Sequence, residues 1–138
     1  MTIIEAIRDY FNSCPLLQGG RINVNYLPSD KQEYTITPTP GEHLVKRYIG
    51  GGGVYQFPFV FGMSAWLDAN AQQAIDNSGF FEHMAEWITE QSNARNLPQL
   101  PDEMTAQKLT IITSGYAHAI DRNGMAKYQM QLNLIYVR

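Results

Sequence analysis

The stretch "MAKYQMQLNLIYVR", residues 125–138, carries the most regular pattern in the chain. Apolar and aromatic side chains alternate with polar ones, which is the period of a β-strand that is buried on one face only. One face would hold Tyr128, Met130, Leu132, Leu134 and Tyr136, and the other Lys127, Gln129, Gln131 and Asn133. The pattern therefore predicts a sheet with one apolar face and one face that is polar but nearly uncharged.

A second strand is predicted just before this one. The stretch "QKLTIITSGYAHAI", residues 107–120, has strand composition, and "DRNG", residues 121–124, is a good turn signal between the two. Together they predict a long antiparallel hairpin that ends the chain.

A glycine-rich hairpin is predicted in the middle of the chain. "HLVKRYI", residues 43–49, and "VYQFPFVFGM", residues 54–63, both have strand composition, and four glycines connect them. In the second run an aromatic residue stands at every second position from Tyr55 to Phe61. We therefore expect an antiparallel pair with a long tip. Pro58 cannot donate a ladder hydrogen bond, so an edge or a bulge is expected there.

The glycine run could also be a phosphate-binding loop. Such a loop needs a Lys and a Ser or Thr after its last glycine and then a helix, and a dinucleotide fingerprint likewise needs a helix. Here Val54-Tyr55-Gln56 follows and reads as a strand. We therefore interpret the run as a hairpin tip and a candidate docking loop that could order on meeting a partner. Its residues are Gly50, Gly51, Gly52, Gly53 and Val54.

Two helices and two short strands complete the expected elements. An amphipathic helix is predicted over residues 2–13 with Thr2 as its N-cap, and short strands over residues 21–28 and 33–38. Residues 64–98 are predicted helical, with a break or kink at residues 77–79 and an end marked by Asn96, Pro98 and Pro101. The apolar stripe of this helix is Phe80, Phe81, Met84, Trp87 and Ile88.

These elements predict an α+β fold with a mostly antiparallel sheet, helices packed on one face and a long C-terminal β-hairpin. The 138 residues are the size of one ordinary domain, and we expect residues 1–138 to form one.

Composition and charge exclude several classes of protein. The net charge is −3 and no basic cluster exceeds the pair Lys46-Arg47, which argues against direct binding to a nucleic-acid backbone. Cys14 is the one cysteine, so an intrachain disulfide and a thiolate-rich zinc site are both excluded. No run of residues approaches the ~18 apolar positions of a membrane span. We expect a soluble intracellular protein with no membrane partner.

The search for catalytic chemistry gives no site. His43, His83 and His118 lack metal-ligand spacing, and Glu82, Glu86 and Glu90 form one acidic line that reads as a solvated helix face. His118 is the one candidate general base, because chloramphenicol-type acetyltransferases use a His, three residues and then Asp-Gly. Here Arg122 stands in the place of that aspartate, and Asp121 comes one residue early. We predict no catalytic, cofactor-binding or metal-binding residue; a small acyltransferase-like enzyme is the alternative.

Four segments resemble a family of small proteins from the head–tail joining region of tailed phages and prophages of Gram-positive bacteria, often labelled minor capsid proteins. They are "YQFPFVFGMSAW", "NSGFFEHMAEWITEQSNARNLPQLP", "TSGYAHAID" and "AKYQMQLNLIYVR". The resemblance covers residues 48–138 well and the first 47 residues loosely. The chain's size, one-sided sheet and long terminal strand also resemble tail terminator proteins, so the expected fold is tail-terminator-like.

The resemblance implies a structural virion protein with no catalytic residues. It would form a homo-oligomeric, commonly hexameric, ring that caps the head-proximal end of the tail tube and joins the tail to the head connector. Its partners would be the tail-tube protein and the connector or stopper protein, and DNA would pass through the lumen without specific binding. It would assemble in the bacterial cytoplasm and end in the phage neck. The alternatives are a head-completion or stopper protein of the neck and, outside phages, a host-cell adaptor domain.

The resemblance also suggests uses for two features of the sequence. The glycine hairpin would be an arm that docks on the tail tube or on an adjacent subunit. The polar face formed by Lys127, Gln129, Gln131 and Asn133 would be either the lining of the lumen or the solvent side of the sheet.

Overall fold

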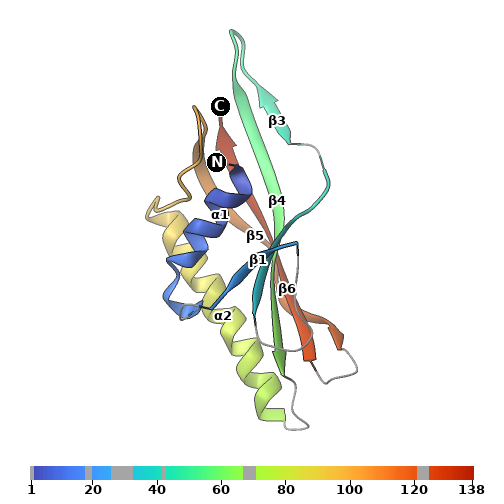
Figure 1. Ribbon diagram of the computed structural model, residues 1–138. Coiled ribbons are helices and arrows are strands. Elements are labelled where there is room, and N and C mark those ends of the chain that lie inside the picture. The colour runs from blue at the N-terminus through green and yellow to red at the C-terminus, as the bar shows by residue number, and fades with distance from the viewer. Residues whose placement is uncertain (1, 18–19, 26–32, 42, 67–70, 121–124) are drawn as a thin grey trace.

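The computed structural model describes residues 2–17, 20–25, 33–41, 43–66, 71–120 and 125–138, with the backbone alone at 66, 71–78 and 118–120. Within these residues the chain forms two α-helices, one 3₁₀ turn and six β-strands (Figure 1). In chain order they are α1 (Ile3–Asn12), η1 (Pro15–Leu17), β1 (Ile22–Val24), β2 (Tyr34–Pro38), β3 (Leu44–Arg47), β4 (Gly53–Trp66), α2 (Ala71–Asn93), β5 (Thr105–Ile120) and β6 (Met125–Val137). The predicted α+β class is confirmed.

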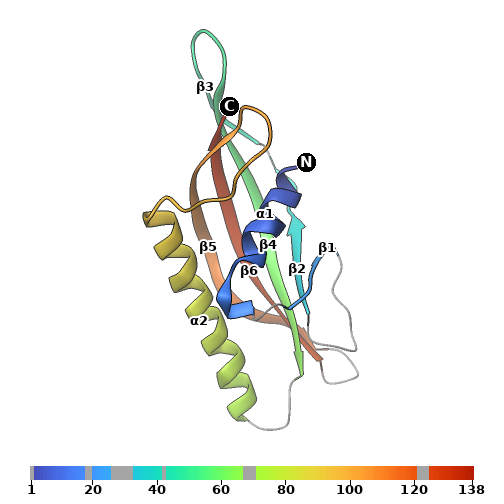
Figure 2. The same cartoon turned by 60° about the vertical axis from the view of Figure 1, so that its left-hand side comes forward.

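The described strands form one sheet in the order β1-β2-β4-β6-β5, and β3 also pairs with β4. Every pair is antiparallel except β1 with β2. Both helices lie on the same side of this sheet, and the β3–β4 hairpin extends beyond the other strands at one end (Figures 1 and 2). The expected mostly antiparallel sheet with helices on one face is therefore present, as are the two strands of the C-terminal hairpin. The predicted turn at 121–124 lies outside the described residues, and one domain over residues 1–138 stays a prediction.

Strand β6 lies between β4 and β5 and has the alternation that its sequence predicts. Leu132 pairs with Phe59 of β4 on one side and with Ile111 of β5 on the other. The five apolar-face residues of β6 are at most 5% exposed, whereas the four on the polar face are only half-buried. Since β4 pairs with β6 from Val54 to Trp66, the alternating aromatics of β4 face the same core.

The core lies between the helices and the apolar face of the sheet. The ring of Phe11 on α1 stacks on that of Phe61 with centroids 5.4 Å apart, and Phe81 of α2 meets Phe61 edge-on at 6.5 Å. Met84 and Ile88, the next residues of the predicted α2 stripe, have no exposed surface. Each such side chain stabilises the fold by about 1.5–3 kcal/mol through removal of apolar area from water. These contacts hold both helices against the sheet.

Helix α1 begins where the sequence predicts. The Thr2 side chain accepts a hydrogen bond from the backbone N–H of Glu5, 3.2 Å away, which is the expected N-cap bond.

The start of α2 corrects the sequence prediction. Residues 64–66 were expected to be helical, but they continue β4, because they pair with residues 125–127 of β6. The helix begins at Ala71 and runs through residues 77–79, so the expected split does not occur. Burial of Phe81, Met84 and Ile88 stabilises the helix by more than the ~1 kcal/mol that one internal glycine costs.

At Pro58, strand β4 pairs with a neighbouring strand on one side only, and the β4–β6 pairing has no bulge there. The pairing of β4 with β6 passes through Pro58 without a register shift. On the other side of β4, β2 ends at the pair Pro38 with Phe59, and β3 begins at the pair Leu44 with Tyr55. Pro58 therefore lies where neither strand pairs with β4, which is where a residue without an N–H fits.

Candidate functional site

The glycine-rich hairpin forms a projecting arm, defined here as residues 44–53. It consists of β3, a turn and the first residue of β4, and its tip lies beyond the ends of β5 and β6 (Figures 1 and 2). Gly50, Gly51 and Gly52 have φ values of 91°, 111° and 75°. Three successive residues in this region demand glycine, because any side chain would be strained. The turn geometry thus explains the glycine run without a ligand.

The base of the arm closes tightly against the end of the chain. Gly53 and Arg138 exchange two backbone hydrogen bonds, each 3.1 Å long. A Cβ on Gly52 would lie 2.5 Å from the Arg138 carbonyl oxygen, and one on Gly53 would lie 2.5 Å from that of Lys46. Gly53 and Val54 therefore belong to the paired strand rather than to the exposed tip, which narrows the docking loop predicted from the sequence.

The arm carries an unusual share of exposed apolar side chains. Residues 43–52 are all exposed, and the Ile49 side chain is as open as in an extended peptide, at 106%. Val45 is 55%, Tyr48 44% and Leu44 37% exposed. Exposed apolar groups gathered in one place indicate a contact surface. These four residues are the functional candidates that the glycine pattern alone did not identify.

Two basic residues lie among these apolar ones. Lys46 and Arg47 are both exposed on β3, and the Lys46 ammonium lies 6.0 Å from the centre of the Tyr48 ring. The arm therefore presents a surface that is both apolar and positively charged.

The four predicted polar-face residues of β6 lie together on the side of the sheet that the helices leave uncovered (Figures 1 and 2). The Asn133 side-chain amide donates to Gln56 Oε1 at 3.2 Å, and Gln129 Nε2 donates to the Tyr116 hydroxyl at 2.5 Å. The Gln131 backbone N–H donates to Thr113 Oγ1 at 3.3 Å. Gln56, Thr113 and Tyr116 extend this face onto β4 and β5, and only the strand register shows that they belong to it.

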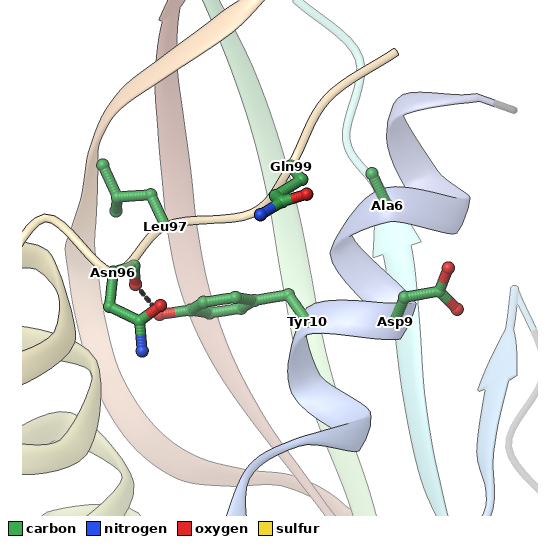
Figure 3. Close-up of a pocket in the computed structure, with 6 residues that line it drawn as sticks. All are labelled: Ala6, Asp9, Tyr10, Asn96, Leu97 and Gln99. Atoms are coloured by element: carbon green, nitrogen blue, oxygen red, sulfur yellow. Dashed lines mark hydrogen bonds between the residues drawn. The ribbon is translucent and has the colours of Figure 1, made fainter.

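A hollow of about 340 Å³ lies between α1 and the segment that follows α2 (Figure 3). Tyr10 lines it, and its hydroxyl donates to the Asn96 carbonyl oxygen at 2.9 Å. Burial, with a smaller contribution from nearby Cys14, raises the pKa of Tyr10 to about 12. A phenol with so high a pKa keeps its proton at neutral pH, so it does not supply a general base. Its bond instead links α1 to the end of α2.

The described residues contain no group of three or more His, Cys, Asp or Glu that could hold a metal ion. His83 Nδ1 lies 3.7 Å from Glu86 Oε2, and both side chains are largely exposed. Cys14 is buried with its sulfur 3.7 Å from that of Met84, and burial raises the pKa of its thiol. The side chain of His118 and residues Asp121 and Arg122 lie outside the described part of the chain, so the acyltransferase alternative is not tested.

A groove runs between α2 and β5 at the edge of the sheet farthest from the arm. One hollow of about 350 Å³ is lined by Phe81, Glu82, Ala85, Glu86, Ser114 and Gly115. A second of about 380 Å³ adjoins it on α2 alone, lined by Ala85, Glu86, Thr89 and Glu90. The acidic line predicted on this helix is exposed, as expected, and it borders the groove.

Among the described residues no helix is long and apolar enough to cross a bilayer. Comparisons with protein-family models and with curated proteins find no match to this chain.

Proposed function

We propose that this chain is a tail terminator of a tailed phage or prophage, which forms a ring on the head-proximal end of the tail tube. The observation that carries the proposal is the arm: a projecting hairpin whose large side chains face solvent, attached to a well-packed sheet. The resemblance of four segments to head–tail joining proteins supports the same role. Such a role needs no catalytic residue.

The mechanism would be geometric. Identical copies that join head to tail close into a ring when the rotation between neighbours allows it. The arm lies at only one end of the long sheet (Figure 1), so the two ends of such a ring would differ. One end would match the tube, and the other would offer no surface for a further tube subunit. Tube growth would then stop, and the second surface would meet the head connector or stopper protein.

The uncovered sheet face suits the lumen of this ring. Its central residues, Gln129, Gln131 and Asn133, are uncharged, and their side chains or backbones bond to other uncharged groups on the face. Each additional Lys or Arg would strengthen attraction to DNA phosphates and increase its salt dependence. The middle of this face would let DNA pass without holding it, and Lys127 and Lys108 lie toward its two ends.

Electron microscopy of tail tubes tests the proposal. Tubes assembled from the tail-tube protein of the same gene cluster should stop growing when the chain is added, and it should be seen at one end of each tube. A double variant, Tyr48→Ser with Ile49→Ser, should cap poorly, whereas its melting temperature should change little because both side chains are largely exposed.

Tubes that lengthen equally with and without the chain would contradict the terminator role. Binding to the isolated head connector, with none to tube ends, would instead assign the chain to head completion.

A further inference from the structure

We infer that the arm of one copy docks into the groove between α2 and β5 of a second copy. This inference deepens the proposed ring and rests on it, because it names the contact that would join neighbouring subunits. Both halves of the contact are present on every chain, so each copy would give one arm and receive one.

Exposed apolar surface is the first argument. The large hydrophobic side chains that are exposed in the described part of the chain fall into two groups. Leu44, Val45, Tyr48 and Ile49 are on the arm. Ile112 and Tyr116, 56% and 42% exposed, are on β5, where Tyr116 pairs with Gln129 on the uncovered face of the sheet. Docking of the arm would remove the apolar area of its four residues from water.

The arm and the groove cannot meet within one chain. In the sheet, β3 pairs with one side of β4, while β6 and then β5 lie on the other side. The arm and helix α2 accordingly lie at opposite edges of the molecule (Figures 1 and 2). A contact between different patches on two copies is heterologous, and it is the kind that closes into rings.

Charge complementarity indicates that the arm of a second copy occupies the groove. The arm has Lys46 and Arg47 exposed, and the groove is bordered by exposed carboxylates at Glu82, Glu86 and Glu90. Lys108 is also on β5, but it pairs with Ile135, so it lies on the face of the sheet opposite the helices and not in the groove. Opposite potentials of this kind favour encounter and fix the register of an interface.

The shape of the groove fits an apolar side chain flanked by basic ones. Ala85 and Gly115 are small, and Phe81 beneath them is buried, so part of the hollow is apolar, while Glu82, Glu86 and Ser114 complete its lining. Ile49 at the tip of the arm is the most exposed large side chain in the described residues and would fill it. The acidic side chains would then lie beside Lys46 and Arg47.

Charge reversal tests this contact directly. Lys46→Glu with Arg47→Glu, and separately Glu86→Lys with Glu90→Lys, should each weaken self-association at least tenfold in sedimentation velocity. Combining all four changes should restore association, because the signs become complementary again. Asp102→Lys with Glu103→Lys alters net charge by the same amount on exposed residues away from the groove, and it should leave association unchanged.

Recovery of association in the combined variant would also show that the substituted chains are folded, because two sets of substitutions that each unfold the chain would not restore association when combined. Undiminished association in both reversal variants, failure of the combined variant to recover, or a wild-type chain that stays monomeric at every concentration would each overturn the inference.

Cross-linking gives an independent measurement. Ile49→Cys copies mixed with Ser114→Cys copies should form a mixed disulfide in excess of either homodimer, because Ser114 is exposed and lines the hollow, while buried Cys14 stays unreacted. Predominance of the Ile49→Cys homodimer would count against the contact.

The two proposals fail in different ways. Rings that form through the arm and groove but do not bind tube ends would contradict the terminator role and leave the arm–groove contact supported. Normal capping of tubes by both charge-reversal variants would contradict the arm–groove contact and leave the terminator role supported.

Discussion

At the scale of single residues, glycine has a different structural role in the arm, at Gly115 and at Gly79. In the arm it permits three successive left-handed φ values. At Gly115 it permits close approach, because a Cβ there would lie 2.2 Å from Cγ of the buried Phe81 ring. At Gly79, inside α2, nothing lies within 4 Å of an added Cβ. The sequence alone does not separate these roles, since each depends on neighbours that the fold supplies.

Two Gly→Ala substitutions should therefore have opposite effects on stability. Gly115→Ala forces Phe81 out of its position and should lower the free energy of unfolding by about 1–3 kcal/mol. Gly79→Ala should raise it by roughly 0.5–1 kcal/mol, because alanine favours the helix and has room. Urea unfolding of both variants checks this, and a Gly115→Ala protein as stable as the wild type would show that α2 does not approach β5 so closely.

Tyr10 predicts a dependence of stability on pH. Its pKa in the folded chain, about 12, lies above the value of 10.0 for a free tyrosine. Between these values the unfolded chain loses the proton first, so ionisation of Tyr10 favours unfolding. Its stabilising effect should be complete below pH 10 and should be lost as the pH rises toward 12.

The control for this pH effect is Tyr10→Phe. It should cost about 0.5–1.5 kcal/mol near neutral pH through loss of the bond to Asn96, and its stability should fall less steeply above pH 10. Equal slopes in urea titrations of the two proteins would contradict the assignment. The pKa values of Tyr34, Tyr136 and Cys14 are also raised, but these groups are common to both proteins.

At the scale of elements, periodicity predicted most of what forms. The alternation in β4 and β6, the stripe of α2 and the cap of α1 all follow local rules that the fold obeys. Local rules failed where pairing decided the outcome. Residues 64–66 have helical neighbours in sequence but complete the ladder with β6, and the breaker signals at residues 77–79 are overridden by packing of the following turn.

The end of α2 offers a direct test of a helix cap. Asn96 N–H donates to the Gln91 carbonyl and Arg95 N–H to that of Ser92, while Arg95 itself has a φ of 59°. This is a Schellman motif with a non-glycine residue in the left-handed position. Arg95→Gly should therefore raise the free energy of unfolding by about 1 kcal/mol, because the steric cost at this position disappears.

Thermal unfolding measures the effect of Arg95→Gly, with Arg95→Ala as the control that removes the charge but keeps the strain. Equal melting temperatures for the two variants would contradict the explanation.

At the scale of the whole molecule, the sheet separates four surfaces. Helices cover one face, a polar network covers the other, and the arm and the groove lie at opposite edges. The sequence predicted the polar face and the glycine tip. The sequence also showed the basic pair Lys46-Arg47 and the acidic line of α2. The exposure of β3, the groove and the positions of these charges beside them could not be predicted, because they depend on which strands lie at the edges of the sheet. The proposed ring follows from this placement together with the family resemblance.

Native mass spectrometry across a concentration series, with and without purified tail-tube protein, tests the central claim most directly. A terminator that works as a ring should appear as a closed assembly, six copies by its resemblance, either alone or when the tube protein is added. A single-copy species at every concentration under both conditions would contradict the account.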